Sequence, residues 1–153
     1  MPIPFSGGCA CGAIRYACSA EPVVSLNCHC RDCQRASGSA YAPVLIVPVA
    51  AFALTKGAPK YHRVTGVTGE NGYTVDRGFC PDCGSPLITT GQRASNFGVI
   101  GLRAASLDDP SWFRPIGDNF VVSAQPWDYL NPALRKFERA PTDEQIRELH
   151  GIE

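Results

Sequence analysis

The sequence predicts a mainly-β protein with few short helices, built as one domain over residues 1–153. The chain contains 15 glycines and 13 prolines, spread along its whole length. This density leaves little room for long helices, because proline removes a backbone donor and glycine loses much conformational freedom inside a helix. Short runs of β-branched and aromatic residues lie between these turn-forming residues, and such runs are typical of strands. The length suits one hydrophobic core.

Seven of these runs are predicted to form strands. In the first run, Ile14, Tyr16 and Cys18 fall on one face while Arg15 falls on the other, which is the period of two expected for a half-buried strand. We expect this face to enter the core and Cys18 to fill space there. The predicted strands are Ala13–Cys18, Tyr41–Val47, Lys60–Val64, Gly72–Phe79, Pro86–Thr89, Phe97–Leu102 and Phe120–Ser123.

Helical signals occur at two places. Arg31–Ser37 is expected to form a short helix or turn directly after a group of three cysteines. Near the C-terminus, Thr142 and Gln145 have the spacing of a capping box, in which each side chain bonds the backbone N–H of the other residue. Apolar residues follow this pair at helical spacing, and Gly151 is expected to end the helix.

The composition argues against several classes of partner. Apolar residues make up 44% of the chain and charged residues 18%, and the formal net charge is zero. Nucleic-acid-binding domains usually carry a basic excess, so no nucleic acid is expected as a partner. The N-terminus lacks the features of a signal peptide, and the apolar stretch Ala40–Leu54 is interrupted by Pro43 and Pro48. We expect a cytoplasmic protein without a membrane partner.

Eight cysteines in a reducing compartment need a role other than disulfide formation. Clustered cysteines in such a compartment most often bind metal. Seven of the eight fall into three clusters, and Cys18 stands alone. The clusters are Cys9-Ala-Cys11, Cys28-His-Cys-Arg-Asp-Cys33 and Cys80-Pro-Asp-Cys83-Gly84.

The last cluster has the form of a zinc knuckle, in which a tight turn presents the sulfurs of Cys80 and Cys83 to one ion. Such a pair needs two more ligands. Cys9 and Cys11 can supply them, because i and i+2 side chains of an extended segment point the same way. Buried free cysteines are the alternative, but two pairs at ligand spacing favour a closed four-thiolate zinc site of the structural type.

The middle cluster offers three ligands, Cys28, Cys30 and Cys33, to a second ion. Cys18 is a possible fourth ligand, although its position on an apolar strand face favours the core. On an extended segment His29 points away from its neighbours Cys28 and Cys30, so we expect it to pack or form a hydrogen bond behind the site. If neither residue binds the ion, one coordination position stays open, which is the pattern of catalytic zinc.

Several motifs follow one another in a specific order along most of the chain. They are Gly7-Gly-Cys-Ala-Cys-Gly-Ala-Ile-Arg-Tyr16, Cys28-His-Cys-Arg-Asp-Cys33, Ser37-Gly-Ser39, Arg77-Gly-Phe-Cys-Pro-Asp-Cys-Gly-Ser85, Leu107-Asp-Asp-Pro110 and Pro126-Trp127. This pattern resembles the GFA/CENP-V family, named for glutathione-dependent formaldehyde-activating enzyme and centromere protein V.

The resemblance implies a β-tent of small mixed sheets around two zinc ions per chain. Its structural zinc would be bound by Cys9, Cys11, Cys80 and Cys83, and its active-site zinc by Cys28, Cys30 and Cys33. The implied activity is that of a carbon–sulfur lyase forming S-(hydroxymethyl)glutathione, with a glutathione-like thiol and an aldehyde as partners. A zinc-dependent thiol carrier without catalysis is the alternative function.

Three arginines are candidates for binding the carboxylates of the thiol, because guanidinium groups bind carboxylates in bidentate fashion. Arg31 and Arg35 lie beside the second cysteine cluster, and each is equally well explained as a solvated surface residue. Motif position favours Arg77, which directly precedes the knuckle. The chain departs from the family pattern at Asp118, where many members carry a histidine, so the resemblance transfers no role to that position.

Overall fold

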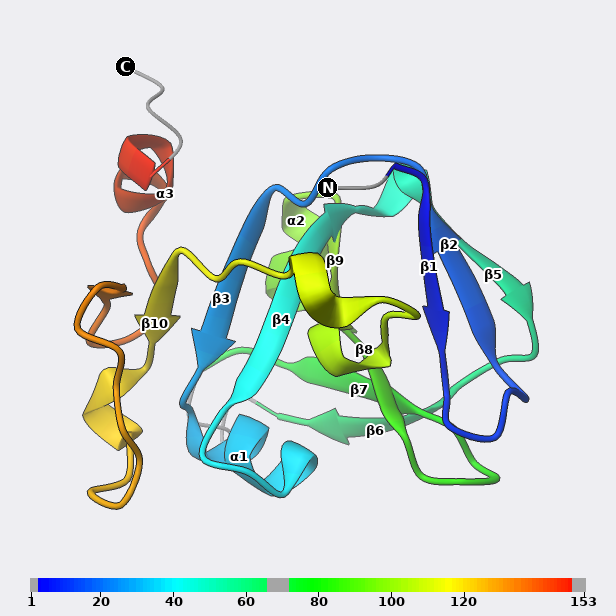
Figure 1. The fold of residues 1–153 in the computed structure, drawn as a ribbon, viewed down its shortest axis with the longest axis horizontal. Coiled ribbons are helices and arrows are strands. Elements are labelled where there is room, and N and C mark those ends of the chain that lie inside the picture. The colour runs from blue at the N-terminus through cyan, green and yellow to red at the C-terminus, as the bar shows by residue number, and fades with distance from the viewer. Residues whose placement is uncertain (1–2, 66–71, 150–153) are drawn as a thin grey trace.

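The computed structural model describes residues 3–65 and 72–149, in which the chain forms eleven strands and three short helices. The smaller sheet has the order β1 (Phe5–Gly8), β2 (Arg15–Cys18) and β5 (Phe52–Lys56) (Figure 1). The larger sheet has the order β11 (Arg135–Lys136), β10 (Gly117–Asn119), β3 (Val24–Cys28), β4 (Ala42–Pro48), β9 (Val99–Arg103), β8 (Pro86–Gly91), β7 (Val75–Phe79) and β6 (Lys60–Val64).

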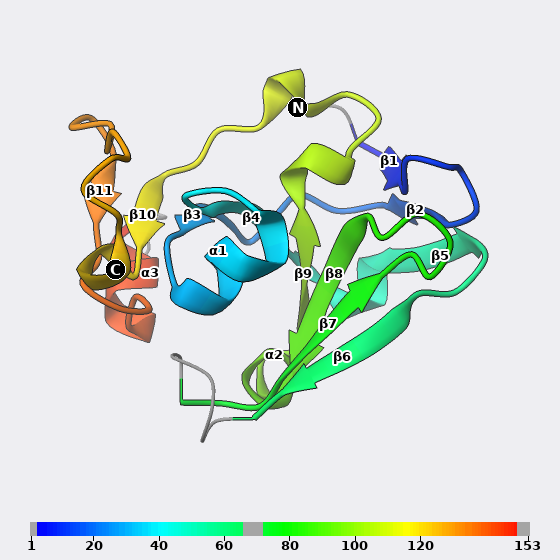
Figure 2. The same ribbon diagram turned by 90° about the horizontal axis from the view of Figure 1, so that it is seen from below.

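The larger sheet is mixed, because β10 runs parallel to both β3 and β11 while the other pairs are antiparallel. Its end strands β10 and β11 lie with α3 (Asp143–Leu149) at the opposite end of the molecule from the three-stranded sheet (Figure 2). The predicted mainly-β fold with mixed sheets and few short helices is therefore confirmed.

The main core lies between the three-stranded sheet and one face of the eight-stranded sheet. Ile14 precedes β2, and Tyr16 and Cys18 lie on it; all three are buried in this core, as their period of two predicted. The larger sheet contributes alternate residues of its central strands, such as Leu45 on β4 and Leu102 on β9. Burying a side chain of this size stabilises the fold by roughly 1.5–3 kcal/mol.

The helices are short, and two of them, α1 and α3, lie where they were predicted. α1 spans Arg31–Ser37, as expected, and lies at the ends of β3 and β4 (Figure 1). The capping box of α3 is formed, since the Thr142 N–H donates to Gln145 Oε1 at 2.9 Å and the Gln145 N–H donates to Thr142 Oγ1 at 3.2 Å. Gly151 lies outside the described residues. In those residues no helix has the length and apolar character needed to cross a membrane.

One predicted strand is wrong. Val121–Ser123 form a 3₁₀ turn. Phe120, which precedes them, adopts a left-handed conformation with φ 55° and ψ 40°, and this conformation ends the extended backbone of β10. The two valines suggested a strand through their β-branched side chains, but Val122 is exposed. Predictions at Gly72–Phe79 and Phe97–Leu102 correspond to the shorter strands β7 and β9. Other elements were not predicted, namely β1, β3, β5, β10, β11 and α2 (Gln92–Asn96).

Replacing Gly7 with alanine is expected to lower the free energy of unfolding by about 1–3 kcal/mol through overpacking. Gly7 lies on β1 opposite Tyr16, and a Cβ atom there would lie 2.4 Å from both the Ser106 carbonyl oxygen and Tyr16 Oη. Urea denaturation measures the change. Gly98→Ala is the control. A Cβ atom at Gly98 would face open space, so this variant loses stability only through the left-handed φ of 62°. Equal losses in both variants would contradict the clash.

Candidate metal centres

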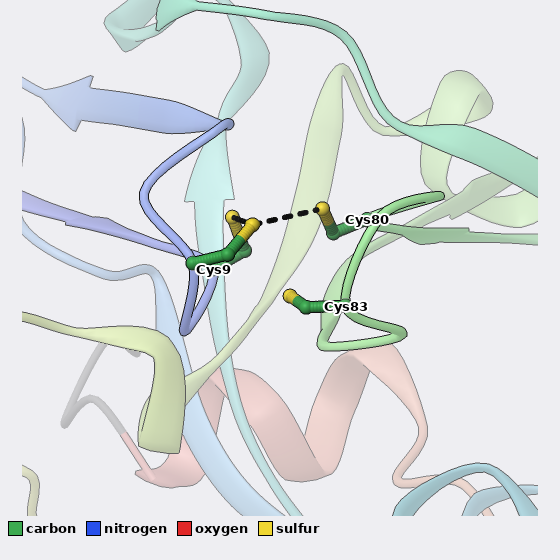
Figure 3. Close-up of side chains that lie close together, drawn as sticks. Cys9, Cys80 and Cys83 are labelled. Atoms are coloured by element: carbon green, nitrogen blue, oxygen red, sulfur yellow. Dashed lines mark hydrogen bonds between the residues drawn. The ribbon is translucent and has the colours of Figure 1, made fainter.

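The first cluster brings together cysteines from two distant turns. Cys9 and Cys11 lie in the turn between β1 and β2, and Cys80 and Cys83 lie in the turn between β7 and β8. Figure 3 shows the sulfurs of Cys9, Cys80 and Cys83 turned toward one another. All four sulfurs lie within 4.8 Å of one another, with 3.5 Å between Cys9 and Cys11 and 3.7 Å between Cys11 and Cys80.

These sulfur positions fit a tetrahedral metal site. Zn–S bonds of about 2.3 Å would place two sulfurs of a tetrahedron about 3.8 Å apart, close to the observed separations. The cysteines are free, so disulfides do not explain the proximity. Hydrogen bonds with the Ser85 side chain and backbone lower the pKa of Cys83 to about 6. The Ile14 N–H also donates to Cys9 Sγ at 3.2 Å. Such donors stabilise thiolates, which are the form that binds metal.

The second cluster forms where β3 passes into α1. Cys28 ends β3, Cys30 is the N-cap of α1, and Cys33 lies in its first turn. The Cys33 N–H donates to Cys30 Sγ at 3.3 Å, and the three sulfurs lie within 4.8 Å of one another. Cys18 is buried in the main core and does not belong to this cluster in the described part of the chain. We call Cys28, Cys30 and Cys33 the triad below.

Two arginines face the triad, the half-buried Arg77 and the buried Arg103. Arg77 on β7 directs Nη1 and Nη2 to Cys33 Sγ at 3.7 and 3.8 Å, and Arg103 on β9 directs Nη1 to the same sulfur at 4.0 Å. Hydrogen bonds from Cys28 and Cys30, together with the charges of Arg103 and Arg77, hold the pKa of Cys33 well below its ordinary value despite its burial. Cys33 is thus the sulfur of the triad best suited to carry negative charge.

Arg103 is a site residue that the sequence reasoning missed. It lies 70 positions after Cys33 in the chain and belongs to no cysteine motif. The pairing of β4 with β9 places it opposite Val44, next to the end of β4 that adjoins the triad. Arg31 and Arg35 were predicted from their place in the motif. Both are exposed on α1, and neither lines the cavity beside the triad.

A cavity of about 650 Å³ extends from the triad along the eight-stranded sheet. Its volume lies in the range of roughly 300–1,000 Å³ that is usual for small-molecule sites. Both Arg77 and Arg103 line it, together with all three cysteines of the triad. The triad is therefore reachable from a space large enough for a small organic molecule.

A buried polar network supports the triad from behind. His29 points away from the neighbouring cysteines, as predicted, and its Nε2 lies 3.2 Å from Asp118 Oδ1. The same carboxylate oxygen accepts from Asn27 Nδ2 at 3.0 Å, and Lys136 Nζ lies 3.0 Å from Asp118 Oδ2. Burial would raise the pKa of Asp118, but Lys136, Asn27 and His29 hold it below its ordinary value. Asp118 thus serves here as a buried hydrogen-bond acceptor.

Phe120 covers the triad on another side. Its side chain is buried in a cluster with Cys30, Cys33 and Ala42. Its left-handed backbone is held by hydrogen bonds, since its N–H donates to the Arg139 carbonyl at 3.2 Å and its carbonyl accepts from the Ser123 N–H at 3.0 Å. A non-glycine residue in this conformation costs roughly 1–3 kcal/mol, and such strain is often found at functional sites.

Comparison with known proteins identifies relatives of this chain. The model of the family described as glutathione-dependent formaldehyde-activating enzyme matches residues 4–123. A Penicillium rubens protein provisionally named as such an enzyme is 31% identical over an alignment 130 residues long, and this alignment covers 78% of this chain but only 65% of the relative's length. A crystal structure of a Rhodobacter sphaeroides protein has a similar fold, with a TM-score of 0.51 and 22% identity over 67% of this chain and 87% of that chain.

The family match includes both cysteine clusters and the strands that position them. The match extends to residue 123 and therefore also includes Arg77, Arg103 and Phe120, which lie around the triad. On the extent of this match, the chain belongs to the family of glutathione-dependent formaldehyde-activating enzymes.

Proposed function

We propose that the protein is a zinc-dependent enzyme of the carbon–sulfur lyase type, which joins a small-molecule thiol to formaldehyde or another aldehyde. One observation carries this proposal: three cysteines converge at the end of a cavity large enough for substrate. The triad would bind the second zinc and leave its fourth position to the substrate thiol, while Cys9, Cys11, Cys80 and Cys83 would bind a structural zinc. The family name supports glutathione and formaldehyde as the first substrates to test.

The chemistry requires a thiolate, because a free thiol at neutral pH is only a few per cent ionised. Zinc bound to the triad would supply it by deprotonating a thiol that coordinates it. The substrate sulfur then forms a C–S bond with the aldehyde carbon as the C=O double bond becomes a C–O⁻ single bond. That oxygen takes up the proton lost by the thiol, giving the hydroxymethyl thioether. The reverse sequence cleaves the C–S bond.

Arg77 and Arg103 are proposed to balance the charge during this step. Three thiolates and one Zn²⁺ carry a net charge of −1, and both guanidinium groups face the sulfur of Cys33. A guanidinium at this position is suited to stabilise the developing C–O⁻, and the cavity would hold both reactants together.

Exchange NMR tests the proposal. A catalytic amount of protein is expected to accelerate the exchange between glutathione plus formaldehyde and their hydroxymethyl adduct. Arg77→Gln is expected to reduce the acceleration roughly a hundredfold, as for the loss of one oxyanion donor. Arg63→Gln is the matched control, because Arg63 lies on the adjacent strand β6 and bonds only the surface Asp76 among the contacts described for its side chain.

An unchanged exchange rate with wild-type protein, at full metal loading, would contradict the enzymatic function. The reaction also proceeds without a catalyst, so the rate must be compared with protein-free buffer. If the thiol binds but exchange is not accelerated, the protein acts as a thiol carrier. Equal rates for Arg77→Gln and Arg63→Gln would leave the enzyme intact and remove the role given to Arg77.

A further inference from the structure

The cavity beside the triad has an apolar wall formed by alternate residues of two strands. Side chains alternate between the faces of a strand, so Val24 and Leu26 on β3 point to the same face as Cys28. The register places Val24 opposite Ile46 and Leu26 opposite Val44 on β4, and all four line the cavity. These four side chains therefore form two apolar rows, one on each strand, and the rows lead along the sheet to Cys28, the first cysteine of the triad.

The wall continues across β9, where a glycine keeps the cavity open. Gly101 pairs with Ile46 on one side and with Thr89 on the other. A Cβ atom at this glycine would contact Thr89 Cβ and Val44 Cγ1, each at 3.4 Å. Other segments add further apolar groups to the lining, namely Ala94, Phe97, Val99, Phe120, Ala140 and Pro141.

Charged groups in the lining are few, and each of the three arginines contacts another group of the protein. Among the lining residues described, the charged side chains are Arg77, Arg93, Arg103 and Asp143. Arg77 and Arg103 face the sulfur of Cys33. Arg93 lies over the Tyr73 ring, 5.7 Å from its centroid, and donates to the Pro141 carbonyl at 3.2 Å. Arg77 Nε is buried without a hydrogen-bond partner in the described structure, and this guanidinium lies at the triad end of the lining, away from the valine and isoleucine rows.

Glutathione fits such a cavity poorly. Its peptide carries two carboxylates and one ammonium group, and any of these groups that lies against the valine and isoleucine wall would lose hydration without gaining a partner there. Burying an unpaired charge is strongly unfavourable, whereas burying an apolar group is favourable in proportion to its area. The wall thus favours a thiol with an uncharged, apolar skeleton.

We propose that the thiol substrate of this site carries an alkyl or aryl skeleton that lies along the β3–β4 wall, with its sulfur at the triad. This inference rests on the proposed function, since it names the substrate class for the same site. The sulfur of this thiol would form the same C–S bond with the aldehyde carbon, and the aldehyde oxygen would take up the thiol proton as before. The charged peptide of glutathione is replaced by a carbon chain.

Protein reconstituted with Co²⁺ provides a direct readout of binding, because a thiolate that joins cobalt changes the visible absorption. The spectrum is titrated with ethanethiol, propanethiol, butanethiol and glutathione. Affinity is expected to rise roughly fourfold with each methylene, from about 0.8 kcal/mol per buried CH₂ group. Glutathione is expected to bind more weakly than butanethiol.

Two variants test the wall itself. Ile46→Ser is expected to remove much of the dependence on chain length, and Thr89→Val, which replaces a hydroxyl by a methyl group in the lining, is expected to tighten butanethiol binding. Leu54→Ser is the matched control, because Leu54 is an exposed apolar residue on β5 in the other sheet. The Thr89 variant keeps the test decisive if Ile46→Ser does not fold.

The outcomes distinguish a failure of the proposed substrate class from a failure of the proposed function. Glutathione binding as tightly as butanethiol, with no dependence on chain length, would overturn the apolar substrate and leave the proposed function standing. If the cobalt spectrum shows a loaded triad but responds to no thiol, both the proposed function and this inference fail. A rising series that Ile46→Ser flattens and Leu54→Ser preserves supports the inference.

Discussion

Cys80→Ser is expected to leave the chain unfolded at neutral pH. Cys80 is fully buried, and its sulfur lies among those of the four-cysteine cluster. That cluster joins the β1–β2 turn of the small sheet to the β7–β8 turn of the large sheet. Binding of structural zinc by small domains contributes about 10–16 kcal/mol to folding, whereas the net stability of a domain is about 5–15 kcal/mol. The binding free energy of this site is therefore as large as the whole stability, and loss of one of its four ligands removes a large part of it.

The measurement combines circular dichroism with elemental analysis of the purified protein. The variant is expected to lose its cooperative thermal transition and the zinc of this site. Cys18→Ala is the matched control, because Cys18 is equally buried but belongs to the hydrophobic core and to neither metal cluster. It should keep its full metal content and a cooperative transition. A folded Cys80→Ser protein with unchanged metal content would show that the cluster is not a structural metal site.

The cysteine clusters could be predicted from the sequence because their geometry is largely local. Cys80 and Cys83 come from one turn, and Cys30 and Cys33 share the first turn of α1. The spacing within each pair limits where the sulfurs can lie. The pairing of the first cluster with the last was reasoned from ligand number, since a pair alone cannot complete a tetrahedral zinc site.

Which residues surround the triad depends on the register of paired strands, and that register cannot be predicted from short sequence patterns. Arg103 reaches Cys33 only because β9 pairs with β4 and places Arg103 opposite Val44. Phe120 was assigned to a strand, yet its place over the triad comes from a left-handed backbone stabilised by the Arg139 carbonyl. The β1 strand was missed because its two glycines weaken the strand signal, although Gly7 is needed for close packing on Tyr16.

At Asp118 the family pattern marked a position close to the site but did not reveal what the side chain contacts. The sequence places it where family members often carry a histidine, which raises the question of an acid–base role. In the structure its carboxylate is buried against Asn27, His29 and Lys136. It points to the network behind β3 and is not part of the cavity lining. The network contacts Asn27 and His29, the two residues on either side of Cys28.

Cys33→Ser is expected to abolish thiol binding and return the hydroxymethyl exchange to its uncatalysed rate, while the fold survives. Both arginines of the site face this sulfur, and hydrogen bonds from Cys28 and Cys30 hold its pKa well below its ordinary value, so it is the sulfur of the triad best suited to be a thiolate. A serine hydroxyl is not ionised at neutral pH and is a weaker zinc ligand. Two thiols alone would not retain the second ion, so zinc should fall from two per chain to one.

Comparing this variant with Cys80→Ser distinguishes an active site from a second structural site. Cys33 lies in the first turn of a short helix near the triad's cavity, whereas Cys80 joins the two sheets. A catalytic centre should therefore tolerate the loss of its metal with a cooperative melting transition and one remaining zinc. If Cys33→Ser instead unfolds as completely as Cys80→Ser does, the second ion is required for folding. Its open position would then no longer support a role in binding substrate.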